Sequence, residues 1–138
     1  MCAADAAAVA ELTSQLGYPA EAAELASRAS EIRERTDGEI LVATDDADRP
    51  IGWIHVAPHA TLEASRQAVI LGLVVAESRR SAGIGAALTE AAEGWARGRG
   101  ATSIIVRSRS TRERAHRFYE RIGYVEVKRS HVFAKPLV

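Results

Sequence analysis

The chain has 138 residues, enough for one domain with one hydrophobic core but short for two. It carries no apolar run long enough to span a membrane and no signal-peptide pattern at its start, and its one cysteine, Cys2, excludes an internal disulfide. We therefore expect a single domain over residues 1–138, in the cytoplasm, with no membrane partner and no metal site.

The net charge of zero conceals two oppositely charged halves. Residues 1–63 carry 12 acidic and 4 basic side chains, a balance of −8, whereas residues 64–138 carry 6 acidic and 14 basic ones, a balance of +8. This asymmetry suits an anionic ligand on the C-terminal half and a cationic partner near the N-terminal half. We expect no nucleic-acid partner, because basic residues alternate with acidic ones and only seven Phe, Trp and Tyr rings could stack on bases.

The first part of the chain predicts two helices and a hairpin. Apolar residues at helical spacing predict helices over 4–16 and 20–35, which a Gly-Tyr-Pro stretch separates. Residues 39–44 and 51–57 have the composition of two short strands joined by a polar turn.

The second part predicts a strand, helix and strand followed by a helix and two more strands. Residues 67–76 are apolar almost throughout, which is typical of a strand covered on both faces. The elements that follow are a helix from 84 that Gly98 or Gly100 ends, a strand at 102–108, a helix at 110–122, and strands at 124–128 and 131–135. This order predicts an α/β domain with a crossover unit in its middle and antiparallel strands at its sides.

A capping box is the predicted start of the last helix. Ser110 followed by Glu113 fits its spacing, and Gly123 is placed to end the helix.

Two glycines, Gly83 and Gly85, join the apolar strand to the helix that follows it. At such a junction backbone N–H groups point outward unpaired, and the helix dipole favours an anion. Glycine lets a phosphate approach the main chain closely, and Arg79 or Arg80 can add positive charge. The pattern is neither a P-loop nor a dinucleotide fingerprint. Taken alone, the stretch is compatible with a phosphate-binding loop and with a simple packing turn.

The last predicted helix carries a tyrosine beside its apolar stripe. Ala115, Phe118 and Ile122 share that stripe, whereas Tyr119 lies on the adjacent arc with Arg112. A tyrosine with an ordinary pKa of about 10 is suited to reprotonate a departing thiolate of similar basicity.

Together these stretches resemble the GNAT superfamily of N-acetyltransferases, and the likeness is specific over residues 68–135. The acetyl-CoA signature of that superfamily, Arg/Gln-x-x-Gly-x-Gly/Ala, is matched by Arg80, Gly83 and Gly85. Its late motif, Ala-x-x-Phe-Tyr-x-x-x-Gly-Phe/Tyr, is matched by Ala115, Phe118, Tyr119, Gly123 and Tyr124. The resemblance implies a GNAT-like α/β fold, with a mixed, mostly antiparallel, twisted sheet flanked by helices. The first strand usual in that superfamily should precede the first helix, but this chain begins almost at that helix, so either most of the strand is missing or the start is shortened.

The resemblance also implies acetyl-CoA as cosubstrate and direct attack of a primary amine on its thioester. Tyr119 would be the general acid for the CoA thiolate. Arg112 stands where the superfamily often has an asparagine, so a phosphate contact and a solvated side chain are both open. The residues implied in cofactor binding are Leu73, Val74 and Val75 along pantetheine, Arg80, Ser81, Ala82, Gly83, Ile84, Gly85 and Ala86 around the pyrophosphate, and Arg112 and Ala115.

The general base is not identified by the sequence. The glutamate that some members of the superfamily carry in the fourth strand is absent here, where Val69 to Leu71 stand. The candidates are His55, His59, Glu63 and His116, and a chain of waters is equally credible.

We expect an enzyme that acetylates a small-molecule or peptide amine, and a homodimer is compatible with the sequence. The alternative is a non-catalytic acyl-CoA-binding sensor or interaction module that keeps the loop but has lost turnover. Tyr119 favours the enzyme.

Overall fold

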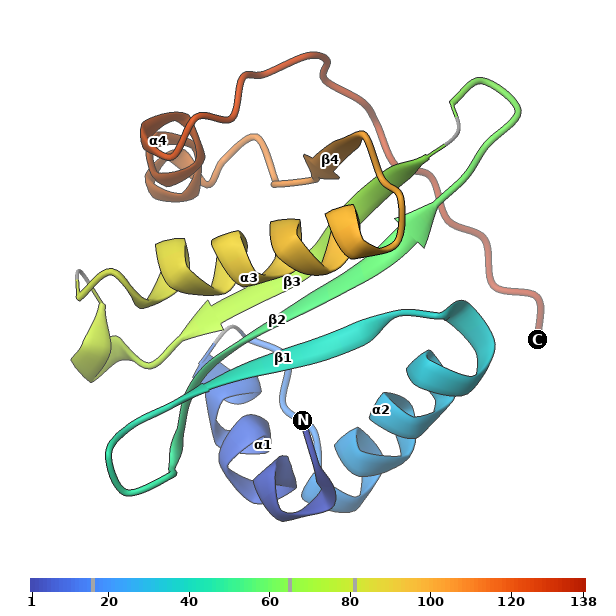
Figure 1. The fold of residues 1–138 in the computed structure, drawn as a ribbon. Helices are drawn as coiled ribbons and strands as arrows, with labels where there is room; N and C mark the ends of the chain where they lie inside the picture. Colours follow the sequence, from blue (N-terminus) through green and yellow to red (C-terminus); the bar gives the residue numbers. More distant parts are fainter. Residues whose placement is uncertain (16, 65, 81) are drawn as a thin grey trace. The chain divides into compact units, whose positions relative to one another are not determined.

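The computed structural model describes residues 1–15, 17–64, 66–80 and 82–138. Its described strands form one sheet in the order β1 (Glu39–Thr44), β2 (Pro50–His59), β3 (Gln67–Val75) and β4 (Ser103–Val106), as Figure 1 shows. Neighbouring strands are antiparallel except for β3 and β4, which the crossover through a helix makes parallel. The predicted mixed, mostly antiparallel sheet is confirmed.

The chain divides into two compact units, Met1–Arg107 and Ser108–Val138. The first unit holds the sheet, and the second holds the last helix. The helices are α1 (Ala6–Gln15), α2 (Ala22–Thr36) and α3 (Ile84–Gly98) in the first unit and α4 (Glu113–Arg121) in the second. None of the described helices combines the length and the apolar character that crossing a bilayer requires.

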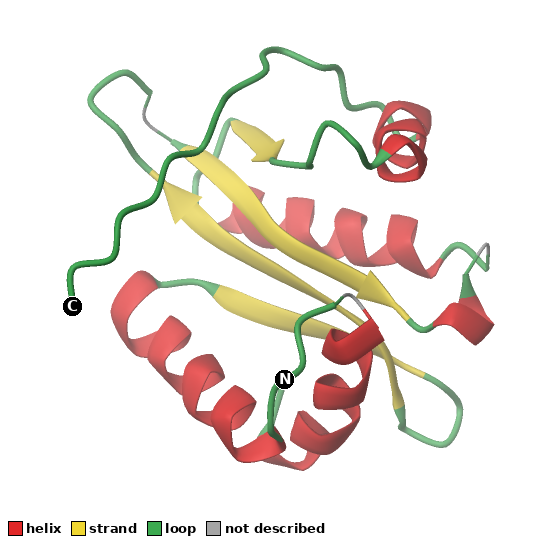
Figure 2. Cartoon of the chain, turned by 180° about the vertical axis from the view of Figure 1, so that it is seen from behind, coloured by secondary structure: helices red, strands yellow, loops and turns green. Residues whose placement is uncertain are grey.

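Helices cover both faces of the sheet in the first unit (Figures 1 and 2). On one face, Gly52 of β2 lies against Leu88 of α3, and the alternate residues Ile54 and Val56 are fully buried. On the other face, Gly38 approaches both Ala57 of β2 and α2. Because side chains alternate along a strand, Trp53 and His55 share the face of Ala57, which α1 and α2 cover.

Most elements of the first unit lie where the sequence predicts them, with ends shifted by a few residues. The hairpin strand predicted over 51–57 extends to Pro50–His59, and Gly100 has the positive φ, 82°, expected after a helix end. No described residue before β1 forms a strand, and Ala3–Asp5 forms a short 3-10 helix. This agrees with a sheet that lacks its first strand.

The structure contains a β-bulge that the sequence reading missed. The register pairs His55 with Gly72 but Val56 with Ile70, so Leu71 has no partner on β2. Leu71 is 55% exposed, although the apolar run predicts a strand covered on both faces. A glycine within an apolar strand often marks such a bulge, so Gly72 was the available signal.

The predictions at the end of the chain are wrong. The described residues at 124–128 and 131–135 form no strand. Their alternation indicates which side chains a sheet would bury, but a strand also needs a neighbour for its backbone hydrogen bonds. Without that neighbour Val125 and Val127 are 80% and 82% exposed.

The predicted capping box is also absent. The cap of α4 is Arg112, with no side-chain cap bond, and Ser110 lies in the preceding turn. The Arg112 N–H donates a hydrogen bond to the Arg109 carbonyl at 3.0 Å. Residues 109–112 therefore form a turn, and the helix begins only after it, at Glu113. Gly123 follows α4 with a φ of 99°, as predicted.

Replacing Gly94 with alanine is expected to stabilise the protein. Gly94 is exposed within α3, and a Cβ at this position would meet no atom within 4 Å. Alanine loses less backbone entropy in a helix, so the free energy of unfolding should rise by about 0.5 to 1 kcal/mol. Urea denaturation measures the change, and an unchanged or lower value would contradict the helical environment described for Gly94.

Candidate active site

The loop between β3 and α3 has the backbone shape that requires glycine. Gly83 is the residue that caps α3, and its φ of 80° lies in the left-handed region. Its carbonyl accepts a hydrogen bond from the Ala87 N–H at 3.0 Å, so the first turn of the helix is formed. Of the residues predicted for this loop, Ser81 lies outside the described ones.

The start of α3 offers backbone donors to an anion. Helix geometry leaves the N–H groups of Ile84, Gly85 and Ala86 without an intrahelical acceptor. Ala82 and Gly83 are exposed directly before them. Since α3 has 15 residues, its dipole adds partial positive charge at the same end. The loop therefore has the donors and the field needed to hold a phosphate.

The two arginines before this loop have different environments. Arg79 Nη2 lies 3.6 Å from Asp45 Oδ2, and the same carboxylate oxygen accepts a hydrogen bond from Arg49 Nε at 3.1 Å. Arg80 is exposed and makes no ion pair with any residue that the structure describes. Arg80 is thus the arginine with a charge available to a ligand.

Replacing Arg80 with alanine is expected to weaken acetyl-CoA binding more than replacing Arg79 does. Loss of one charged contact to a phosphate should cost about 1 to 1.5 kcal/mol, or roughly fivefold to tenfold in affinity. Isothermal titration at low and high salt measures it, because salt screens an exposed contact. Equal losses in the two variants would contradict the distinct roles.

The edge of β3 that faces β4 is paired over only half its length. The parallel pairing runs from Gln67 with Ser103 to Ile70 with Val106. From Leu71 to Val75 no described strand pairs with this edge, while the other edge stays paired to β2 from Gly72 to Val75. The predicted pantetheine residues Leu73, Val74 and Val75 lie in this open stretch. Backbone groups there can pair with an extended, amide-containing ligand as with an added strand.

Tyr119 of the second unit is half-buried on α4. Its ring lies 5.1 Å from that of Phe118 and 5.7 Å from that of Tyr124. Burial raises the pKa of the Tyr119 phenol, and the positive charge of Arg112 opposes the rise. The phenol therefore keeps its proton at neutral pH, as a general acid must. Ala115 is half-buried on the same helix, and Arg112 is exposed.

The predicted site residues fall into two sets. The open edge of β3 and the loop belong to the first unit, whereas Arg112, Ala115 and Tyr119 belong to the second. The structure brings the members of each set together. The approach of Tyr119 to the loop stays a prediction.

The four candidate bases lie in different environments. His116 is engaged, since its Nε2 lies 2.8 Å from the Arg109 carbonyl oxygen, and Glu63 is exposed in a loop. His59 is half-buried at the end of β2. His55 is half-buried in the middle of β2, its Nε2 is buried, and burial lowers the pKa of its imidazole.

Trp53 of β2 has a buried polar atom that packing alone does not explain. Its indole ring fills the space above Gly72, where a Cβ would come within 2.9 Å of the ring. Its Nε1 is buried and has no hydrogen-bond partner among the described residues. The alternation along β2, which puts Trp53 and His55 on one face, was the signal in the sequence.

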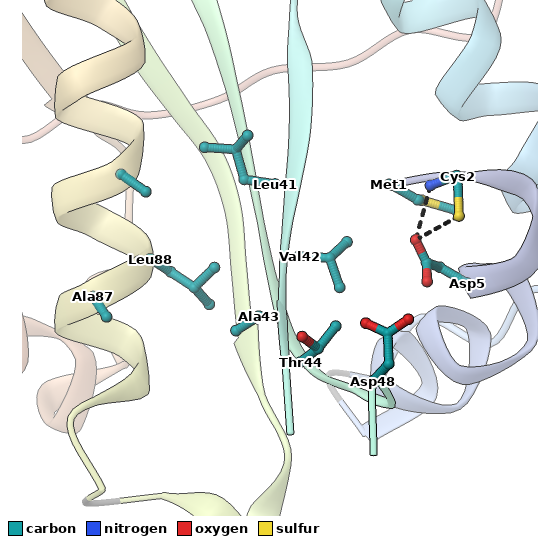
Figure 3. A pocket seen from close by; sticks show the side chains of 11 residues that line it. Met1, Cys2, Asp5, Leu41, Val42, Ala43, Thr44, Asp48, Ala87 and Leu88 are labelled. Carbon is teal, nitrogen blue, oxygen red and sulfur yellow. Dashed lines mark hydrogen bonds between the residues drawn. The ribbon is translucent and has the colours of Figure 1, made fainter. Parts of the chain in front are cut away.

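A groove of about 710 Å³ follows the outer edge of β1 (Figure 3). It is lined by β1, by Ala87 and Leu88 of α3 and by N-terminal residues. One of these, Asp5, already has a hydrogen-bond partner within its own segment. Its carboxylate accepts a hydrogen bond from the Cys2 N–H at 2.8 Å, which lowers the Asp5 pKa. Since β2 separates β1 from β3, this groove does not border the open edge of β3, and we assign it no cofactor.

Comparison with known proteins places these features in a family context. Residues 7–124 match the model of the Acetyltransferase (GNAT) family. The chain is 32% identical over 117 residues to aminoglycoside N(6')-acetyltransferase type 1 of Klebsiella aerogenes, covering 78% of this chain and 77% of that protein.

Solved structures with similar folds include an aminoglycoside antibiotic 6'-N-acetyltransferase of Acinetobacter baumannii. Its TM-score is 0.82 at 17% identity, over 100% of this chain and 96% of that one. AAC(6')-Iy in complex with the bisubstrate analog CoA-S-monomethyl-acetylneamine has a TM-score of 0.83 at 20% identity, over 99% of this chain and 95% of that one. At these identities the likeness establishes the fold.

Proposed function

Because the chain belongs to the acetyltransferase (GNAT) family, we propose that it acetylates a primary amine of an aminoglycoside. The chain is an acetyl-CoA-dependent N-acetyltransferase. The observation that carries the choice of acceptor is its 32% identity to an aminoglycoside N(6')-acetyltransferase over most of both chains.

The charge of the chain supports a polycationic acceptor. Residues 1–63 carry a net charge of −8. An acidic surface raises the local concentration of a cationic substrate and speeds its association. An aminoglycoside, with several ammonium groups, has the matching charge.

The cofactor is proposed to lie along the open edge of β3 and over the loop. Pantetheine pairs with the main chain of Leu73 to Val75, and the pyrophosphate accepts hydrogen bonds from the N–H groups at the start of α3. Arg80 contributes its charge, and Ser81 completes the proposed loop. The two units act together as one acetyltransferase domain, which is consistent with a family match that spans residues 7–124.

The proposed reaction is a direct transfer. The lone pair of the neutral amine attacks the carbonyl carbon of the thioester and forms a tetrahedral intermediate. When that intermediate collapses, the C–S bond breaks, the Tyr119 phenol gives its proton to the sulfur, and the positively charged nitrogen loses one proton to solvent as the amide forms. Solvent returns a proton to Tyr119. Cys2 has no part, because no acyl-enzyme forms.

Release of free CoA thiol tests the proposal. The purified protein is incubated with acetyl-CoA and one of two aminoglycosides that differ only in an amine or a hydroxyl at the 6' position. A polyamine and a lysine peptide serve as other amines. We expect thiol release with the 6'-amine compound and little with its 6'-hydroxyl partner. Turnover only with the peptide would overturn the acceptor, and acetyl-CoA binding without any turnover would favour the sensor.

A further inference from the structure

Two side chains on one face of β2 carry buried nitrogens without hydrogen-bond partners among the described residues. Trp53 Nε1 and His55 Nε2 have no hydrogen-bond partner among the described residues. They belong to alternate residues of one strand, so their Cα atoms are about 6 to 7 Å apart on the same face. An unsatisfied buried polar group costs about 1 to 3 kcal/mol, and such groups call for an explanation such as catalysis.

The chemistry of the pair is complementary to an amino sugar. An indole N–H can only donate, so it suits a hydroxyl oxygen. A neutral imidazole nitrogen can accept, so it suits an ammonium or amine N–H.

His55 lies next to the place where β3 leaves its neighbour. Its register partner is Gly72, which follows the unpaired Leu71 and precedes Leu73, the first residue of the proposed pantetheine edge. Directly opposite residues in an antiparallel pair have Cα atoms about 4.5 to 5.5 Å apart. His55 therefore lies one strand, about 5 Å, from the strand along which the cofactor is proposed to lie, on the sheet face that α1 and α2 cover.

Burial alone determines the direction in which the pKa of His55 shifts. Desolvation lowers the pKa of the imidazole, and no charged neighbour contributes. β3 has no ionisable side chain, and β1 carries Glu39. The helices on the face of His55 carry Glu11 on α1 and Glu24, Arg28, Glu31, Arg33, Glu34 and Arg35 on α2, whereas α3, on the opposite face, carries Glu90, Glu93 and Arg97. The imidazole is thus neutral at neutral pH and able to take a proton.

We propose that His55 is the general base that deprotonates the acceptor ammonium. The proton passes from the ammonium nitrogen to His55 Nε2, directly or through one water, and the freed lone pair attacks the thioester. The Tyr119 proton goes to the sulfur. The nitrogen loses its second proton to solvent as the amide forms, and solvent returns a proton to Tyr119. The net result is one acetyl group transferred and one proton released to solvent through His55. This inference rests on the proposed function.

Replacing His55 with glutamine tests the proposal by rate and by pH. The variant should lose about 10²- to 10⁴-fold in kcat/KM at pH 7 and keep its acetyl-CoA affinity. In the wild type, activity should be level from pH 7 to 8 and fall below about pH 6.5, where imidazole takes up a proton. In the variant, activity should instead rise about tenfold per pH unit across that range, because only free amine from solution reacts.

The control is His131→Gln, which changes an exposed histidine of the second unit that has no role in the proposed reaction. A His55→Gln variant with wild-type kcat/KM overturns the proposal. The proposal is also overturned if the fall in activity below about pH 6.5 disappears in His59→Gln and persists in His55→Gln. If His55→Gln does not fold, a wild-type profile that shows no ionisation below pH 7 overturns it. A wild type that acetylates no amine rejects the proposed function itself, which is a different outcome.

Discussion

Replacing Tyr119 with phenylalanine is expected to lower kcat by about 10²- to 10⁴-fold and to leave acetyl-CoA affinity unchanged. The change removes one oxygen and keeps the ring that packs against Phe118 and Tyr124. Without the phenol, the thiolate leaves without a positioned proton donor. Steady-state thiol release and calorimetric binding of acetyl-CoA separate the two effects.

The dependence of activity on pH gives a second test of Tyr119 as the general acid. A general acid works only while it is protonated, and burial raises the pKa of this phenol above its ordinary value of about 10. The wild type should therefore keep its acid function up to at least about pH 10, and Tyr119→Phe should have no ionisation from this group. Tyr124→Phe removes a neighbouring phenol as the matched control and should keep its kcat. Equal kcat in Tyr119→Phe and wild type would reject the acid.

Replacing Gly83 with valine should weaken acetyl-CoA binding by roughly 5- to 150-fold, which corresponds to about 1 to 3 kcal/mol of backbone strain. The reason is the left-handed φ of 80°, which a β-branched residue adopts only at a cost. Crowding within the protein is not the cause, because a Cβ at Gly83 meets no atom within 4 Å. The added side chain would also stand where the proposed phosphate lies. Isothermal titration with acetyl-CoA measures the loss.

Gly94→Val is the matched control for this experiment. It makes the same change in α3, where the backbone has no positive φ and where a Cβ also has open space. Its acetyl-CoA affinity should equal that of the wild type. If Gly83→Val is folded and binds as tightly as Gly94→Val, the loop is not the pyrophosphate site.

Local sequence patterns predict much of the first unit because the spacing of apolar residues and the turn residues determine its helices and strands. The spacing around Leu88 and Ala92 predicts α3, and both residues are buried against the sheet. The position of Gly83 between a strand and a helix predicts a loop residue, and its positive φ explains why this position requires glycine.

Features that depend on distant partners could not be predicted in this way. The bulge at Leu71 reflects a register with β2 that no local alternation encodes. The open edge at Leu73 to Val75 depends on where β4 ends, and the pairing of Arg79 with Asp45 depends on a hairpin turn more than 30 residues earlier. The failed strand predictions at the end of the chain have the same cause, since alternation without a pairing strand does not make a sheet.

The candidate bases show the same division. The sequence identifies four residues able to accept a proton and cannot rank them. The structure distinguishes them by partners and burial: His116 is bonded to a carbonyl, whereas His55 Nε2 is buried without a partner among the described residues. Neither property is visible in the local pattern around the residue.

The initial-velocity pattern tests the central claim, direct transfer from acetyl-CoA to an amine, most directly. Acetyl-CoA and a 6'-amino aminoglycoside are varied together, and the acetylated product is counted by mass spectrometry against the thiol released. Direct attack in a ternary complex predicts double-reciprocal lines that intersect and one acetylated amine for each CoA thiol. Parallel lines, which indicate an acyl-enzyme, or thiol release without acetylated amine would contradict the account.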